Sequence, residues 1–140
     1  MAELSLSMAL TIAEGALAWA RTQNYKPLSV VVLDAGGHSK VVLREDGTGF
    51  FGVSIASAKA SGIVGFNLSS SRILAERFDN RPGIVAALSV VTCGQFMPGV
   101  GGRQIRDQDG ALLGSVAAAG ALPDEDEAAV VAGLAAAGLE

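Results

Sequence analysis

His38 is the only histidine among the 140 residues, and an imidazole can ligate a metal ion or haem iron and can titrate near neutral pH. It ends the stretch Asp34-Ala35-Gly36-Gly37-His38, which lies between two valine-rich runs. Asp34 could orient the imidazole, but an Asp at such a position more often caps the turn, and we favour that role. A loop histidine that hydrogen-bonds only within its own turn is an equal alternative. One histidine and one cysteine do not make a zinc site within a single chain.

The segment 94–102 is the most irregular part of the sequence, and an arginine follows it. Repeated glycines allow the backbone to come close to a ligand. The candidate ligand-binding residues here are Phe96, Met97 and Val100 as an apolar wall, together with Gly101, Gly102 and Arg103. An arginine beside glycines can bind a carboxylate through two parallel hydrogen bonds. The alternatives are a connector with two core side chains and, for Arg103, a solvated strand end or an ion pair between subunits.

Other reactive or charged residues receive structural interpretations. Cys93, in an apolar setting, is expected to be buried. Lys59, in the middle of a helix, is expected to be a surface lysine whose stem lies along apolar neighbours. Arg44 and Asp46 are expected to form an ion pair at a strand end. The acidic run at 124–127 suits the first turn of a helix, where negative charge is favoured. The chain contains no Walker-type phosphate loop and no nucleophile elbow.

Two hairpins and several helices must position these residues. Residues 29–33 and 40–43 are β-branched runs separated by a short glycine-containing loop, which predicts antiparallel neighbours. Residues 103–107 and 111–118 flank an Asp-Gly turn and predict a second hairpin. Helices are expected from Ser5 or Ser7 to about 22, over 54–66, 72–78 and 84–92, and over 124–139, where Gly133 interrupts. In the first helix, Met8, Ile12, Ala16 and Trp19 form one apolar stripe. This order predicts an α+β fold, an antiparallel sheet with helices packed on it.

Length and composition set further bounds. A chain of 140 residues is expected to be one domain, residues 1–140. The net charge of −4 and the few scattered basic residues argue against nucleic-acid binding. The chain is 50% hydrophobic with a mean hydropathy of +0.43, yet no apolar run reaches the ~18 residues of a membrane span. We therefore expect a homo-oligomer and no membrane partner. The N-terminal 20 residues lack a basic leader, which favours a mature helix and a cytoplasmic protein.

The motifs, taken in order, resemble the GlcG/HbpS family of haem-binding and haem-degradation-associated domains, which includes the C-terminal domain of PduO-type adenosyltransferases. They are VVLDAGGH at 31–38, REDG at 44–47, AKA at 58–60, GGRQI at 101–105, DG at 109–110, LGSVAAAG at 113–120 and the acidic last helix. The resemblance covers nearly the whole chain and implies a profilin-like fold. It also implies a homo-oligomer and haem or a related tetrapyrrole as the ligand. Arg103 and Gln104 depart from it, because the family more often has an apolar residue and Pro there.

Two functions follow as hypotheses. The first is a small-molecule-binding protein for haem or a related tetrapyrrole, with His38 as the candidate iron ligand and the segment from Phe96 to Val100 as a wall. The second is a cofactor-free isomerase, lyase or hydrolase acting on a small anionic substrate. In that enzyme, Arg103 would hold the carboxylate and His38 would act as acid or base. An oligomeric scaffold without chemistry is the third alternative.

Overall fold

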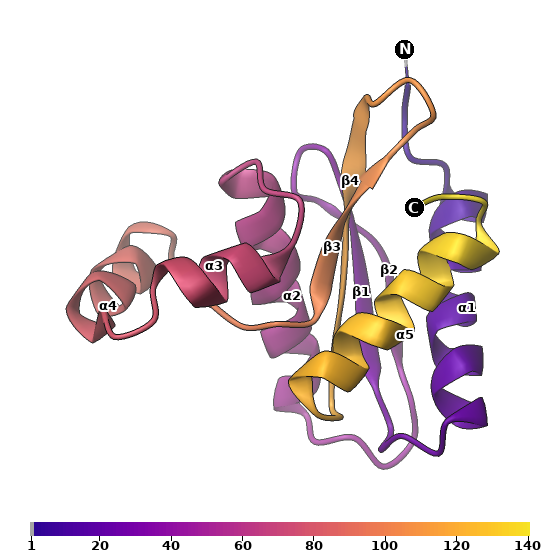
Figure 1. Cartoon of the computed structure of the whole chain (residues 1–140), viewed down its shortest axis with the longest axis horizontal. Coiled ribbons are helices and arrows are strands. Elements are labelled where there is room, and N and C mark those ends of the chain that lie inside the picture. Colours follow the sequence, from indigo (N-terminus) through magenta and orange to yellow (C-terminus); the bar gives the residue numbers. More distant parts are fainter. Residues whose placement is uncertain (1) are drawn as a thin grey trace.

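The computed structural model describes residues 2–140, and its centre is a four-stranded antiparallel sheet in the order β2-β1-β4-β3 (Figure 1). The strands are β1 (Ser29–Asp34), β2 (Ser39–Arg44), β3 (Gly102–Arg106) and β4 (Leu112–Ala119). Both predicted hairpins are therefore present. One strand of each hairpin, β1 and β4, pairs with the other in the middle of the sheet, where Ser29 lies opposite Ala119 and Asp34 lies opposite Gly114.

The two central strands are buried on both faces, which explains their runs of small and β-branched residues. Val30 and Val32 face one side of the sheet and belong to the larger core, whereas Val31 and Leu33 face the other side and belong to a smaller one. Within β4, residues 113–119 are all buried. Layers of helices on both faces are required to keep such strands from water.

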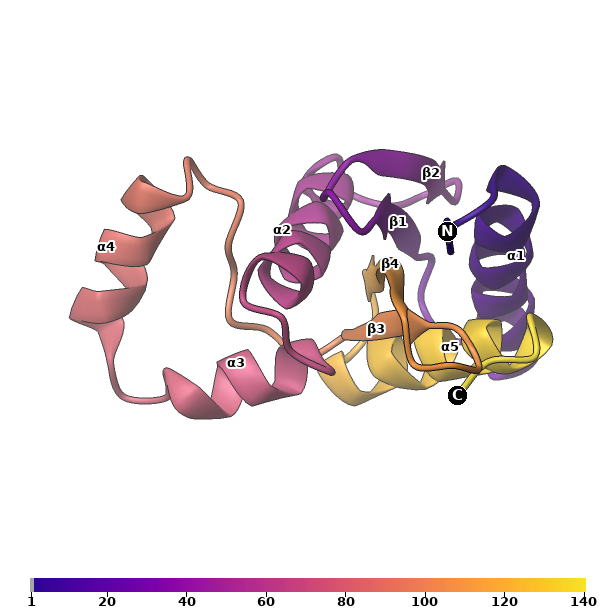
Figure 2. The same ribbon diagram turned by 90° about the horizontal axis from the view of Figure 1, so that it is seen from above.

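Three of the five described helices supply those two layers. The helices are α1 (Leu6–Thr22), α2 (Phe51–Gly65), α3 (Ser71–Arg77), α4 (Pro82–Val91) and α5 (Pro123–Ala136). α1 and α5 cover one face and α2 covers the other, as Figure 2 shows from above. The predicted α+β fold is confirmed, with helix boundaries within a few residues of those expected. The first helix is capped by Ser5, whose side chain accepts a hydrogen bond from the Met8 amide at 3.0 Å.

α1 and α5 touch backbone to backbone. A Cβ atom placed on Gly133 would lie 2.3 Å from the Ile12 carbonyl oxygen, and one on Gly15 would lie 2.7 Å from the Ala136 side chain. Gly133, which the sequence suggested as an interruption of the last helix, is thus a contact point within a continuous helix. The close approach of the two helices compensates for the low helix propensity of glycine.

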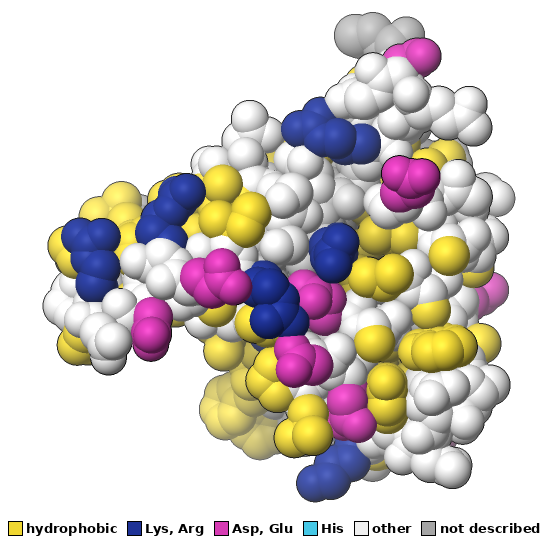
Figure 3. All heavy atoms as spheres, viewed as in Figure 1, with side chains coloured by type: hydrophobic (Ala, Val, Ile, Leu, Met, Phe, Trp, Pro, Cys, Tyr) yellow, Lys and Arg dark blue, Asp and Glu magenta, His cyan; other side chains and the backbone are white. Residues whose placement is uncertain are grey.

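α3 and α4 form an arm that extends away from the sheet (Figures 1 and 2). Every residue of α4 is at least partly exposed, although the helix is almost wholly apolar. Ile84, Val90 and Val91 are 41%, 79% and 77% exposed. Hydrophobic side chains gather on the arm at the left of Figure 3. An isolated ten-residue helix is marginal in water, so α4 is a surface that lacks its packing partner within the described chain.

Several sequence predictions are wrong at the level of single side chains. Trp19 lies on the predicted stripe of α1 but is 41% exposed. Cys93 is exposed rather than buried, just beyond the end of α4. Among the described residues, Arg44 and Asp46 form no ion pair; the residue between them, Glu45, pairs with Arg21 at 3.0 Å instead. α2 starts at Phe51, three residues earlier than predicted, and its residues before Ala56 are all at least partly exposed.

A membrane-spanning helix is not found anywhere in residues 2–140, since none of the helices combines the necessary length and apolar character.

Candidate functional site

The loop between β1 and β2 is held in place by Asp34. Its Oδ1 atom accepts hydrogen bonds from the amides of Gly36 at 2.9 Å and His38 at 3.0 Å. The backbone closes the turn as well, because the Asp34 amide donates to the His38 carbonyl at 2.8 Å. Gly37 adopts φ +84°, which a residue with a side chain would adopt only with strain. The predicted capping role of Asp34 is confirmed.

The imidazole of His38 projects from this fixed loop into solvent. Its side chain is 84% exposed, and its Nδ1 atom lies 3.5 Å from Asp34 Oδ1. Hydrogen bonding from the His38 amide, aided by that from Gly36, lowers the pKa of Asp34, so this carboxylate remains charged beside the ring. A carboxylate at one ring nitrogen orients the imidazole and leaves the other nitrogen, Nε2, for a ligand.

The residues predicted to form an apolar wall in the glycine-rich segment lie partly in the core and partly at the surface. Phe96 is only 4% exposed, and its ring meets those of Phe66 and Phe78 edge to face, with centroids 5.5 and 5.6 Å apart. These contacts attach the returning end of the arm to the body. Met97 and Val100 are half-buried. Phe96 therefore has a structural role in this chain.

Gly101 and Gly102 are both buried. Gly101 lies against a buried ion pair of Lys59 with Asp126, here called the polar staple, which the sequence did not predict. Lys59 is 4% exposed and its Nζ atom donates to the Ala118 carbonyl at 2.9 Å and to Asp126 Oδ2 at 3.4 Å. A Cβ atom on Gly101, which has φ +136°, would lie 2.8 Å from that Nζ atom. The prediction of a surface lysine is wrong, because Asp126 on α5 supplies a buried partner 67 residues away.

Burial dominates the ionisation of this pair. It lowers the pKa of Lys59, against the opposing effect of Asp126, and it raises the pKa of Asp126 to about 6 in spite of Lys59. Asp126 also accepts a hydrogen bond from the Ala121 amide at 3.0 Å. The staple thus joins α2, the end of β4 and the start of α5. Every polar atom described here has a partner, which is typical of a structural rather than a reactive pair.

Arg103 lies beside a second ionic cluster at the start of α5. Its Nε atom is 3.6 Å from Glu127 Oε2, and neither atom has a hydrogen-bond partner among the described residues. Arg72, from α3, donates to the other oxygen of Glu127 at 3.0 and 3.2 Å. Arg103 therefore faces a carboxylate of its own chain.

The structure places His38 and Arg103 at opposite edges of the sheet. His38 directly precedes β2, Arg103 belongs to β3, and β1 and β4 lie between them. Three strand spacings amount to roughly 14 Å. A catalytic site that uses both residues within one chain, as the enzyme hypothesis requires, has no support in this arrangement. Within residues 2–140, no group of three or more His, Cys, Asp or Glu side chains could hold a metal ion.

Comparisons with known proteins identify one family and several solved structures with a similar fold. The sequence model of a family described as "Haem degrading protein HbpS-like" matches residues 4–135. The crystal structure of HbpS is 29% identical, with a TM-score of 0.80 over 96% of this chain and 90% of that one. A complex of PduOC with haem is 22% identical, with a TM-score of 0.84 over 96% and 95%. Klebsiella pneumoniae protein ORFY is 18% identical, with a TM-score of 0.86 over 100% and 95%. A search of curated proteins gives no match.

Proposed function

We propose, because the chain belongs to the HbpS-like family, that it binds haem and that the imidazole of His38 ligates the iron. The observation that carries this assignment is the exposed ring of His38 beside the charged Asp34. HbpS is similar over most of its length, and PduOC, which shares the fold, has been solved with haem. When bound, haem would supply an iron centre capable of redox and ligand-binding chemistry.

The residues of the β1–β2 loop suit this role. The hydrogen bonds that the Asp34 carboxylate accepts from the Gly36 and His38 amides fix the loop before any ligand arrives, so little ordering entropy is lost on binding. Asp34 would hold the proton on Nδ1 and so present Nε2 as the ligand atom. Lys40, exposed two residues further along, would offer an ammonium group to a propionate. This ring is the one imidazole that the chain can offer.

A haem titration followed by absorbance tests the assignment. The wild-type protein is expected to give a saturable Soret shift near one haem per chain, and His38→Ala is expected to lose it. Added imidazole should restore the spectrum of the variant, because it replaces the missing ligand. Arg44→Gln, at the far end of β2, is the matched control and should behave as wild type. A wild-type spectrum in His38→Ala would remove the ligand assignment, and the absence of any shift in the wild type would remove haem binding.

We further propose that the chain self-associates through α4. Burying Ile84, Val90 and Val91 against a second copy would remove their exposed apolar surface from water, at roughly 25 cal/mol per Å². A neighbouring copy would also cover the side of the haem that the exposed His38 loop leaves open to solvent. Sedimentation should give an oligomer for the wild type and a smaller species for Val90→Glu/Val91→Glu. An unchanged mass in that variant would exclude α4 as the interface.

A cytoplasmic location is also proposed, since a chain with a single cysteine cannot rely on internal disulfides for stability. Cell fractionation with an antibody to this protein tests it.

A further inference from the structure

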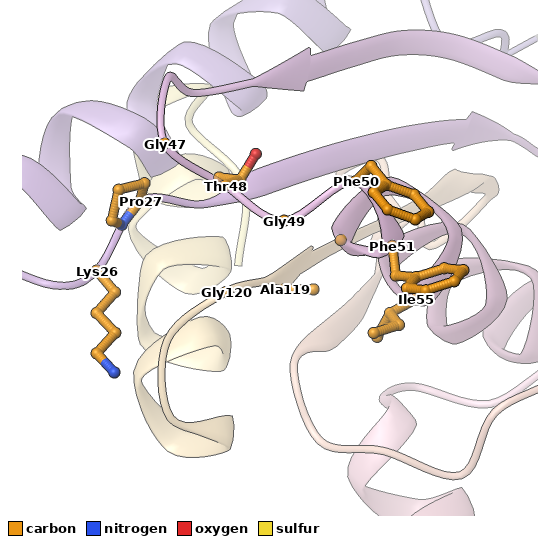
Figure 4. Close-up of a pocket in the computed structure, with 11 residues that line it drawn as sticks. Lys26, Pro27, Gly47, Thr48, Gly49, Phe50, Phe51, Ile55, Ala119 and Gly120 are labelled. Atoms are coloured by element: carbon orange, nitrogen blue, oxygen red, sulfur yellow. The ribbon is translucent and has the colours of Figure 1, made fainter.

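A cavity of about 410 Å³ lies at the end of the sheet remote from His38. Figure 4 shows its walls, which come from the links before β1 and after β2, the start of α2 and the end of β4. β2 separates it from His38, and six strand residues span roughly 20 Å. The cavity is therefore distinct from the site proposed for haem.

One wall consists of two exposed aromatic rings. Phe50 and Phe51 are 77% and 65% exposed, and their centroids are 4.4 Å apart with planes inclined at 39°. Ile55 lies beside them, and Ala119 lines the cavity from β4 (Figure 4). Two adjacent exposed phenyl groups are unfavourable in water unless something apolar covers them. Rings of this kind favour a flat aromatic partner, which stacks against them at close range.

The polar groups of the cavity favour an anion. Among its described lining residues, Lys26 alone has a charged side chain, and it lies across the cavity from the rings (Figure 4). The first turn of α2 contains no acidic residue, and no side chain caps it. The Gly52 amide donates to the Gly49 carbonyl at 3.0 Å, and the start of the helix carries partial positive charge.

A buried hydroxyl lies behind the wall of the cavity. Ser29 lies next to two lining residues, its cross-strand partner Ala119 and Gly52, on which a Cβ atom would lie 2.8 Å from Ser29 Oγ. Ser29 is 0% exposed, and this oxygen has no hydrogen-bond partner among the described residues. Buried hydroxyls are rarely left unpaired. Ser29 does not itself line the cavity, and its Oγ lies behind the lining residue Gly52, at the start of α2.

We propose that this cavity is a second small-molecule site, which binds an aromatic carboxylate. The ring of the ligand would lie against Phe50 and Phe51, and its carboxylate would face Lys26 across the cavity. The site does not depend on haem, and nothing in it requires His38.

Titration calorimetry with 1-naphthylacetate and its neutral analogue 1-naphthylacetamide tests the proposal. The acid is expected to bind more tightly than the amide by roughly fivefold, the scale of a partly exposed ion pair. Lys26→Gln should remove that difference, and Phe50→Ala/Phe51→Ala should weaken both probes at least tenfold. All three side chains are exposed, so these variants should fold, which circular dichroism would check.

His38→Ala and Lys40→Gln are the matched controls, and both should bind naphthylacetate as wild type does. Loss of binding in His38→Ala would mean that the probe occupies the haem site and would overturn the proposal. Equal affinity for acid and amide would overturn the assignment of an anion. A wild type that binds neither probe, together with a lower oligomer mass in Phe50→Ala/Phe51→Ala, would show that a second copy of the chain covers the rings.

Discussion

Replacing Lys59 by methionine tests the interpretation of the buried staple. Methionine fills a similar volume but removes the ammonium group, which leaves Asp126 buried without its charged partner and the Ala118 carbonyl without its donor. Breaking a buried ion pair in this way costs about 3–5 kcal/mol of unfolding free energy at pH 7.5. Lys40→Met is the control, because Lys40 is exposed and its loss should change stability by no more than about 0.5 kcal/mol.

The loss of unfolding free energy in Lys59→Met should depend on pH, and the direction of that dependence follows from the pKa of Asp126. Its pKa is raised from 3.8 to about 6 in the folded protein, so its contribution to stability is fully present below pH 4 and is lost as the pH rises through 6. At 1.36 kcal/mol per pH unit, that loss is about 3 kcal/mol. Without Lys59 the pKa of Asp126 rises further, because Lys59 is what lowers it. The variant therefore keeps a neutral Asp126 at pH 5, and its deficit shrinks to about 1–3 kcal/mol, the cost of an unmade hydrogen bond.

Urea unfolding at pH 5 and pH 7.5, at one fixed protein concentration, measures both values. The double variant Lys59→Met/Asp126→Asn should lose less than the sum of the single variants, since it buries no charge. A deficit below about 1 kcal/mol, or one equal at the two pH values, would refute the view that a buried charged pair holds this corner together.

Three further outcomes are expected. Gly133→Val should lower the unfolding free energy by at least about 3 kcal/mol, because its side chain would meet the Ile12 carbonyl; Gly65→Ala, with open space around it, is the control and should be neutral or stabilising. Phe96→Ala should cost about 3–5 kcal/mol in urea unfolding, and a loss below 1 kcal/mol would contradict its place in an aromatic core. Asp34→Asn keeps an acceptor for the loop amides but removes the charge beside His38, so haem affinity should fall about 10- to 100-fold by absorbance titration; unchanged affinity would show that Asp34 only caps the turn.

The backbone of this protein could be predicted from sequence because its signals are local. Valine-rich runs on either side of Asp34 and the glycines, and an Asp-Gly pair near residue 110, specify two hairpins with no knowledge of distant contacts. The same loop fixes where His38 lies. His38 was a candidate haem ligand because it is the only histidine in the sequence, and the exposure of its ring came from the structure.

The side chains whose burial was predicted wrongly depend on residues far away in the chain. Lys59 lies among small residues, which suits a surface helix unless a carboxylate is brought to it, and Asp126 comes from another helix. Cys93 has apolar neighbours in sequence, but they belong to an arm that finds no cover within the described chain. A single sequence contains no signal for either pairing. Only the structure shows that a titratable residue such as Lys59 is buried.

The departures from the family pattern at 103–104 are accounted for by neighbours within the chain. Arg103 faces Glu127, the Gln104 amide nitrogen donates to Asn67 Oδ1 at 3.3 Å, and Arg106 Nε donates to Gln104 Oε1 at 2.7 Å. Arg103 thus lies beside a carboxylate, and the Gln104 side chain is hydrogen-bonded to Asn67, after α2, and to Arg106 in its own strand. An anionic ligand at Arg103 would have to displace a carboxylate that is already in place. The cavity at Lys26 holds no such competitor among its described residues, which makes it the better place to look for an anion.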